Sequence, residues 1–233
     1  MGKYTYLLID FFSILVPLLF SFEKRIFFIK KMPALFPALI ITGSFFIIWD
    51  HYMTIWNVWG FNKAYVSGLY LWDLPIEEWL FFIAIPYSCI FIYESLNFLI
   101  KSDQINKFAK NISVVLCVIL SVTVLFNFGK LYTSIKFILA VLMLVFTIVK
   151  KPPFMGKFYR AYLVSLIPFF IVNGLLTSIP VVTYNNNENL GIRLGTIPIE
   201  DTIYLLLLLL MNIVIYEFFK KILLPNVKPS SIH

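Results

Sequence analysis

Two short acidic motifs, residues 75–78 (Pro-Ile-Glu-Glu) and 198–201 (Pro-Ile-Glu-Asp), are the parts of the sequence most suited to chemistry. Their acidic residues are Glu77, Glu78, Glu200 and Asp201. Two carboxyl groups brought together in a low dielectric cannot both stay ionised, so one of them keeps its proton. A protonated acid beside an ionised one suits acid–base chemistry on an uncharged substrate. We therefore regard these four acids as candidate catalytic residues.

The same motifs also fit the ordinary start of a helix, because proline suits the first helical position and carboxylates satisfy free N–H groups there. Two observations favour chemistry: the pattern occurs twice, and it lies among apolar residues, where ionised groups are costly and usually functional. Successive helical residues point about 100° apart. Glu77 and Glu78 therefore cannot aim at one spot, and we expect one to face a pocket while the other supports the helix start.

The composition indicates an all-α membrane protein. Of the 233 residues 61% are hydrophobic and only 13% are charged, with a mean hydropathy of +0.89. A soluble domain has roughly 25% charged residues, and a soluble core could not hide this much apolar surface. The net charge of +7 does not indicate a nucleic-acid partner, because the basic residues form short clusters between apolar runs. Cys89 and Cys117 lie inside apolar runs, so we expect packing rather than a disulfide or metal site.

Seven segments are long enough, or nearly so, to cross a bilayer. They are residues 4–22, 34–49, 75–99, 112–128, 131–149, 161–182 and 198–224. The fifth contains Lys136, which we expect to extend to the membrane interface, as lysines near helix ends do.

Basic residues are distributed unevenly between the two sides of the membrane. One side would hold only five of the nineteen: Lys3, Lys63, Lys130, Lys136 and Arg193. The side with more basic residues is normally cytoplasmic. We therefore predict an integral protein of a bacterial or archaeal cell membrane, with the N-terminus outside and the C-terminus in the cytoplasm.

An internal repeat relates the two acidic motifs. A shift of 123 positions superposes them and also places Thr54 on Thr177, Gly68 on Gly191 and Asp50 on Asn173. The repeat predicts two three-helix units, residues 1–110 and 129–233, joined by a linker helix in residues 111–128. One crossing between two three-helix units restores the starting side, so the repeats should lie parallel, with a site at their interface. A pseudo-two-fold axis could then bring Glu77 near Glu200, or Glu78 near Asp201.

Further polar and aromatic residues are candidates for binding a substrate. Asp50 and Asn173 lie towards the same membrane side as the motifs, and they could line the site or bond to a neighbouring helix. Asn62 and Asn185 stand in the connecting loops, where a turn-forming role is the alternative. Trp49 belongs to a group of tryptophans that could form an interfacial belt or stack on a conjugated ligand.

Other polar residues fit structural roles. Glu94 and Glu217 fit partners for lysines near the cytoplasmic end, while Asp10 and His51 are single and unrepeated, which favours a structural role for both.

These residues resemble the membrane-bound lycopene cyclases of the fused heterodimer type and the fungal type. The first half carries Trp49-Asp50, Gly68, residues 74–78 and Phe81-Phe82. The second carries residues 172–174, Tyr184-Asn185, residues 191–193 and 197–201. The likeness covers nearly the whole chain, and it adds Tyr184 to the candidate substrate contacts.

The resemblance implies an enzyme of carotenoid biosynthesis that acts on a linear carotenoid dissolved in membrane lipid. Such enzymes convert the linear ψ-ends of lycopene to β-ionone rings without net redox change. An acid protonates the terminal C1=C2 bond, the C5=C6 bond attacks the cation, and a base removes a proton. The sequence has no Gly-x-Gly-x-x-Gly run, so we expect no dinucleotide cofactor.

Two other functions share parts of this pattern. A small-solute transporter could have the same three, one and three helices, although the polar groups here lie towards one face rather than at mid-membrane. A related carotenoid-modifying enzyme, such as a hydratase, shares much of the pattern. A retinal-binding protein fits poorly, because the last segment has no lysine between Thr202 and Phe219.

Overall fold

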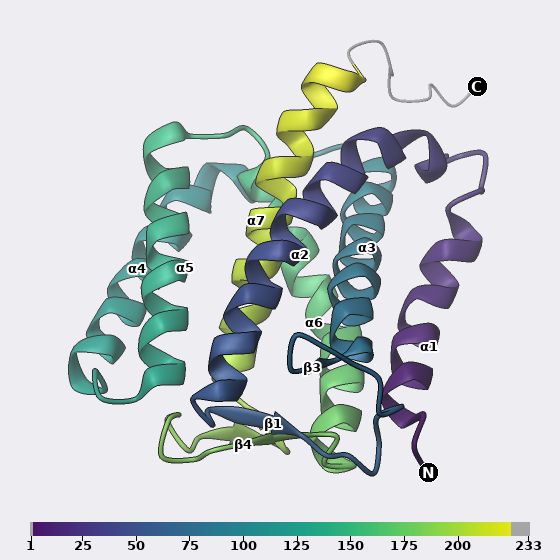
Figure 1. The fold of residues 1–233 in the computed structure, drawn as a ribbon. Helices are drawn as coiled ribbons and strands as arrows, with labels where there is room; N and C mark the ends of the chain where they lie inside the picture. Colours follow the sequence, from purple (N-terminus) through teal and green to yellow (C-terminus); the bar gives the residue numbers. More distant parts are fainter. Residues whose placement is uncertain (1, 225–233) are drawn as a thin grey trace.

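Long apolar runs fold into helices because a helix satisfies its own backbone hydrogen bonds within the bilayer. The computed structural model describes residues 2–224, so Lys228, one of the basic residues counted towards the cytoplasmic side, lies outside the described part. The helices are α1 (Thr5–Phe20), α2 (Met32–Ile55), α3 (Ile76–Leu99), α4 (Asn106–Phe126), α5 (Leu131–Lys150), α6 (Met155–Ser178) and α7 (Glu200–Leu223) (Figure 1). A short 3₁₀ turn, η1 (Phe28–Lys31), precedes α2.

Six of the seven helices in the described chain are long and apolar enough to cross a membrane. The prediction of an integral membrane protein built mainly of helices is therefore confirmed. α1 is the exception, because its 16 residues span about 24 Å and the hydrocarbon core is about 30 Å thick. It ends at Phe20, where the chain turns towards η1.

Three helices extend further into charged sequence than the apolar segments suggest. α2 continues to Ile55 and therefore contains Asp50, while α4 begins at Asn106 and α6 at Met155. The start of α6 is stabilised by Arg160, whose guanidinium donates to the Asn97 side chain at 2.9 Å. Polar residues at the membrane interface can still be helical. Hydropathy marks only the apolar part of each helix, so it predicts helices that are shorter than the observed ones.

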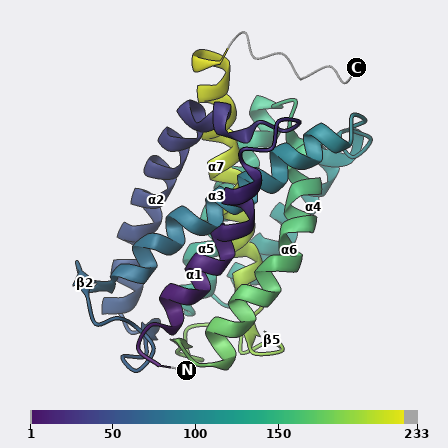
Figure 2. The same cartoon turned by 90° about the vertical axis from the view of Figure 1, so that its right-hand side faces the viewer.

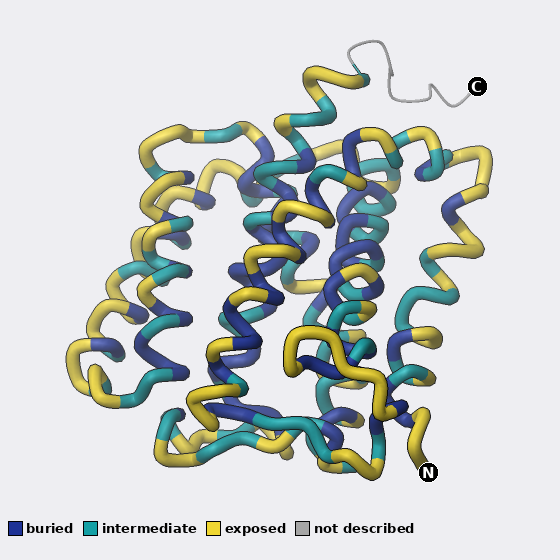
Figure 3. Tube along the Cα trace, viewed as in Figure 1, coloured by how far each residue is buried: buried dark blue, intermediate teal, exposed yellow. Residues whose placement is uncertain are grey.

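The helices pack as neighbouring pairs. α2 lies along α7, α3 contacts α6, α1 lies along α3, and α5 contacts α7, while α4 lies at the edge against α5 and α6 (Figures 1 and 2). Figure 3 shows buried positions gathered along α2, α3 and α7 and exposed positions on the outward face of α4. These outward residues are largely apolar, as expected for surface that faces lipid.

Short strands organise the loops at the end of the bundle where the chain begins (Figure 1). The strands are β1 (Trp59–Phe61), β2 (Tyr70–Leu71), β3 (Leu74–Pro75), β4 (Val182–Tyr184), β5 (Arg193–Leu194) and β6 (Ile197–Pro198). β2 pairs with β3 immediately before α3, and β5 pairs with β6 immediately before α7. Each hairpin therefore fixes the first turn of the helix that carries an acidic motif.

β1 and β4 join the two loops to each other. They pair antiparallel with Gly60 opposite Thr183, 123 positions away. The flanking hydrogen bonds repeat with the same shift: Asn62 N donates to Val181 O, and Asn185 N donates to Val58 O, both at 2.9 Å. This ladder holds the starts of α3 and α7 in a fixed relation.

A polar cluster at the opposite end confirms the expectation that Glu94 and Glu217 partner lysines. Glu94 binds both Lys31 and Lys220, and Lys220 also reaches Glu217 at 3.4 Å. Tyr216 donates to Glu94 and Tyr93 donates to Glu217, each at 2.8 Å. The cluster ties η1, α3 and α7 together far from the acidic motifs.

A substitution at Gly156 can test the close approach of α6 to the start of α4. An added Cβ there would collide with the Asn106 backbone and the Asp103 carboxyl group. We expect Gly156→Ala to cost about 1–3 kcal/mol, measured as a lower thermal unfolding midpoint in detergent. Gly129→Ala is the control, since nothing lies within 4 Å of its added Cβ. Equal midpoints for the two variants would contradict this packing.

Candidate active site

A small cavity of about 50 Å³ lies where α3 and α7 begin. Three acidic residues from three helices line it: Asp50 of α2, Glu78 of α3 and Asp201 of α7. The remaining polar lining is Asn173 and four tyrosines, Tyr6, Tyr132, Tyr184 and Tyr204. The rest is apolar or aromatic, with residues such as Trp59, Phe61, Phe81 and Phe169. The structure therefore brings Glu78 and Asp201, one acid from each motif, to one cavity.

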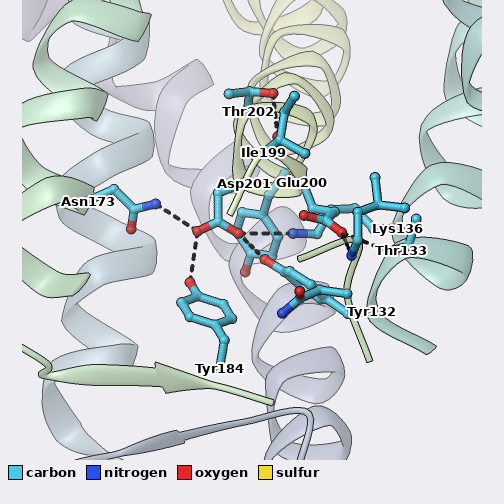
Figure 4. Close-up of polar contacts among 12 residues, drawn as sticks. Tyr132, Thr133, Lys136, Asn173, Tyr184, Ile199, Glu200, Asp201 and Thr202 are labelled. Carbon is cyan, nitrogen blue, oxygen red and sulfur yellow. Dashed lines mark hydrogen bonds and ion pairs between the residues drawn. The ribbon is translucent and has the colours of Figure 1, made fainter. Parts of the chain in front are cut away.

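Asp201 accepts hydrogen bonds from four side chains. Asn173 Nδ2 and Tyr184 Oη each donate at 2.8 Å, Lys136 Nζ lies 3.3 Å away, and the Tyr132 hydroxyl makes a short contact. Figure 4 shows Asn173 and Tyr184 on one side of the carboxyl group and Tyr132 and Lys136 on the other. These donors and the ammonium charge stabilise Asp201 as a carboxylate.

Glu78 has a different environment, in which its neighbours include another acid. It accepts from Tyr6 Oη at 2.6 Å, and the buried carboxyl group of Asp50 lines the same cavity. Asp50 also accepts from Tyr204 Oη at 3.2 Å. Two carboxyl groups buried at one cavity repel each other in a low dielectric when both are ionised. The pair Asp50–Glu78 is therefore an arrangement that can hold a proton.

Glu77 and Glu200 point away from the cavity and hold the loops. Glu77 Oε1 accepts from Ser67 N and Glu200 Oε1 accepts from Leu190 N, both at 2.6 Å, and Ser67 and Leu190 are 123 positions apart. Glu200 also accepts from Thr133 Oγ1 at 2.8 Å. The structure therefore gives the two acids of each motif different surroundings: one lines the cavity and the other anchors the loop before the helix.

The remaining sequence candidates fall into two groups. Asp50, Asn173 and Tyr184 line the cavity. Asn62 and Asn185 do not line it, because their side-chain oxygens accept the backbone N–H two residues on, from Ala64 and Asn187. Asn62 and Asn185 therefore form turns in the connecting loops, which was the alternative to substrate binding.

Trp49 lies behind the cavity wall. It is buried, stacks on Phe46 and contacts the edge of the Tyr204 ring, with centroids 5.8 and 6.2 Å away. It therefore supports a lining residue rather than lining the cavity itself.

Tyr184 reaches the site from β4, outside the membrane-spanning helices. Its burial, and then the Asp201 carboxylate beside it, raise the pKa of Tyr184 well above its ordinary value. The phenol consequently keeps its proton and acts as a donor to Asp201.

Lys136 is the main correction to the sequence interpretation. We expected its side chain to extend to the membrane interface, whereas it is fully buried and paired with Asp201. Its ammonium group also lies 3.4 Å from the centre of the Tyr132 ring. Burial is possible here because an opposite charge and an aromatic face replace water. A lysine within an apolar run was the visible signal of this role.

Tyr6, Tyr132, Thr133 and Tyr204 were not among the sequence candidates. Their partners lie 67 to 154 positions away, so no local pattern marks them. Tyrosines are also common in apolar helices near the interface, where they need no special role.

A second, much larger cavity adjoins the small one. It has a volume of about 870 Å³, and most of its lining comes from α1, α3 and α6. Figure 2 shows the arrangement of these three helices. Apolar side chains dominate its walls, and Phe81, Phe169 and Asn173 line both cavities. The molecule thus has a large, mainly apolar cavity beside a small polar one.

Comparison with known families identifies the chain. A model of the lycopene cyclase family matches residues 3–96 and 129–219, which is most of the sequence. This chain belongs to the lycopene cyclase family. Family membership implies an enzyme of carotenoid cyclisation, and it does not favour the small-solute transporter. No curated protein and no solved structure matches the chain.

Within residues 2–224 no group of three or more His, Cys, Asp or Glu side chains is placed to hold a metal ion.

The anchoring role of Glu200 can be tested through the exposure of its loop. We expect Glu200→Gln to weaken the hydrogen bonds to Leu190 and Thr133 and to let the loop open more often. Trypsin cleavage after Arg193 in the purified cyclase should then become faster by at least about threefold. Asn187→Ala, in the same loop but without a side-chain contact to the anchor, is the control. Unchanged cleavage in Glu200→Gln would contradict the anchoring role.

Proposed function

We propose that this protein is a lycopene β-cyclase that converts the linear ψ-ends of lycopene to β-ionone rings by carboxylate acid–base chemistry, without a redox cofactor. The observation that carries the proposal is the convergence of Glu78 and Asp201 on one cavity with aromatic walls. Cyclisation requires a proton donor, a proton acceptor and surroundings that exclude water while a carbocation exists. The polar groups of the cavity supply the first two, and its aromatic lining supplies the third.

The proposed reaction has three steps. A carboxyl group protonates C2 of the terminal double bond, leaving a cation at C1. The C5=C6 electron pair then forms the C1–C6 bond and moves the cation to C5. A carboxylate removes the proton from C6, which completes the C5=C6 double bond of the β-ring. Other aromatic side chains of the lining, such as Trp59, Phe61 and Phe81, can stabilise the passing positive charge.

The large cavity is the proposed site for the polyene chain. Its apolar lining between α1, α3 and α6 suits a hydrocarbon. A lycopene molecule that enters from the lipid would place its chain there and its end group in the small cavity. This arrangement needs no exposure of the substrate to water.

We further propose that the two halves are parallel repeats related by a pseudo-two-fold axis, with the linker helix in residues 111–128. Three observations support this. α2 packs on α7 as α3 packs on α6; the backbone contacts of Glu77 and Glu200 recur with a shift of 123; and the family model matches two segments that leave out α4. The units would be residues 1–110 and 129–233, and the active site would lie at their interface.

The proposed orientation places the acidic motifs towards the outside of a bacterial or archaeal cell membrane, with the C-terminus in the cytoplasm. The burial of Lys136 removes one basic residue from the outer side. Four then remain there against fourteen of the nineteen on the other side, which strengthens the charge bias.

Expression in cells that accumulate lycopene tests the proposed function. We expect cyclic carotenoids on chromatography, and we expect Glu78→Gln and Asp201→Asn each to lower their formation at least about 100-fold while the protein still inserts. Glu23→Gln, an acid in the exposed loop at the far end, should behave as wild type. Well-folded wild-type protein that leaves lycopene linear would contradict the proposal.

The polyene site can be tested by filling it. Val172 lines the large cavity, so Val172→Trp should raise the KM for lycopene at least about fivefold and change kcat less, because it removes binding volume without touching the acids. Ile40→Trp places the same ring on an exposed face of α2 and serves as the control. Equal KM values for both variants would place the chain elsewhere.

A further inference from the structure

The two halves differ at two pairs of positions that decide where protons and charges lie. Tyr6 of α1 and Tyr132 of α5 each donate to the second acid of a motif, Glu78 and Asp201. One helical turn after these tyrosines stand Asp10 and Lys136, an acid in one half and a base in the other. The second difference is Asp50 against Asn173: Asp50 lines the small cavity with Glu78, whereas Asn173 donates to Asp201.

The second half is arranged around a negative charge. Lys136 is fully buried, and its Nζ lies 3.3 Å from Asp201 Oδ1. The Asp201 carboxyl group also accepts hydrogen bonds from Tyr132, Asn173 and Tyr184. A carboxyl group with four donors, one of them a cation, has no proton to give. It can still accept the proton of a carbon next to a carbocation, because that proton is strongly acidic.

The first half surrounds its acidic residues with conditions that favour protonated carboxyl groups. Asp10, Asp50 and Glu78 are all buried, and among the described residues neither oxygen of Asp10 has a hydrogen-bond partner. Asp10 stands one helical turn after Tyr6, the donor to Glu78, and Glu78 and Asp50 line the same cavity. Three carboxylates without a cation donating to them would repel one another in a low dielectric, so this group holds protons.

We propose that the two halves supply different partners for the acid–base reaction. Glu78 in the first half is the acid, Asp201 in the second half is the base, and Lys136 is the positioning residue that keeps Asp201 ionised. This inference rests on the proposed cyclase function and assigns its two proton transfers. Glu78 gives its proton to C2 and becomes a carboxylate, and Asp201 takes the proton of C6 and becomes an acid. Return of that proton to Glu78 restores the enzyme, so no net proton is consumed.

Deuterium labelling separates the two roles. In D₂O an acid that works without its base deuterates C2 reversibly, and C2 of the cation then carries one hydrogen and one deuterium. Loss of the hydrogen leaves the label, so lycopene recovered from Asp201→Asn should gain deuterium while little ring forms. Lycopene recovered from Glu78→Gln should gain none, because the first step is blocked. Deuterium in the lycopene from Glu78→Gln, or its absence from that of Asp201→Asn, would overturn the assignment.

Kinetics of Lys136 variants test its role through Asp201. We expect Lys136→Met to lower kcat at least about tenfold with a KM within about threefold of wild type. Lys136→Arg keeps the charge and should be at least about threefold faster than Lys136→Met. Adding Lys136→Met to Asp201→Asn should cost no more than about twofold further, since the lysine acts through the missing carboxylate.

Lys31→Met is the matched control, because Lys31 is paired with Glu94 at the other end of the bundle. Lys31→Met should keep wild-type kinetics. This result would show that the effect of Lys136→Met comes from the lost charge beside Asp201 and not from the loss of any buried ion pair. Wild-type kcat in Lys136→Met, or a full additional loss in the double variant, would overturn the positioning role. A wild-type protein that does not cyclise lycopene would instead overturn the proposed function, so the two failures are distinguishable.

Discussion

Carboxyl groups buried in an apolar bundle need donors or protons, and this requirement governs the end of the molecule that carries the acidic motifs. Asp201 satisfies it with side chains from α5, α6 and β4. Glu77 and Glu200 satisfy it with backbone N–H groups of the loops that precede their own helices. Each acid thereby fixes the segments that solvate it, and the β1–β4 ladder ties those segments together. The site and the fold at this end have a common physical cause.

The sequence predicted the helices and the part of the site that repeats. The paired motifs, the 123-residue shift and the apolar runs indicated the bundle, the candidate acids and the family. It could not show which acid of each motif faces the cavity, because that depends on how the hairpins before α3 and α7 close. It could not show Tyr6 or Tyr132 either, since each meets its acid across about 70 positions. Lys136 was visible as a charge in an apolar run, but only the fold reveals Asp201 as its partner.

The two adjoining cavities suit a substrate that is apolar along its length and reacts at its end. The larger cavity is lined mainly by apolar side chains, which can take the place of lipid around the substrate. The smaller cavity is lined by carboxyl groups and aromatic side chains. The polar residues that would be costly along a polyene are thus confined to the place where charge develops. The backbone contacts around the site repeat between the two halves. The side chains do not, because the halves differ at Asp10 and Lys136 and at Asp50 and Asn173. The two sides of the smaller cavity therefore differ in chemistry.

The central claim is that one end group lies between Glu78 and Asp201 in a single composite site. An experimental structure with lycopene bound to an inactive variant tests it most directly. The account predicts one ψ-end in the small cavity, with C2 facing Glu78, C6 facing Asp201 and the polyene running between α1, α3 and α6. A carotenoid bound elsewhere on the bundle, or an end group that reaches neither carboxyl group, would contradict it.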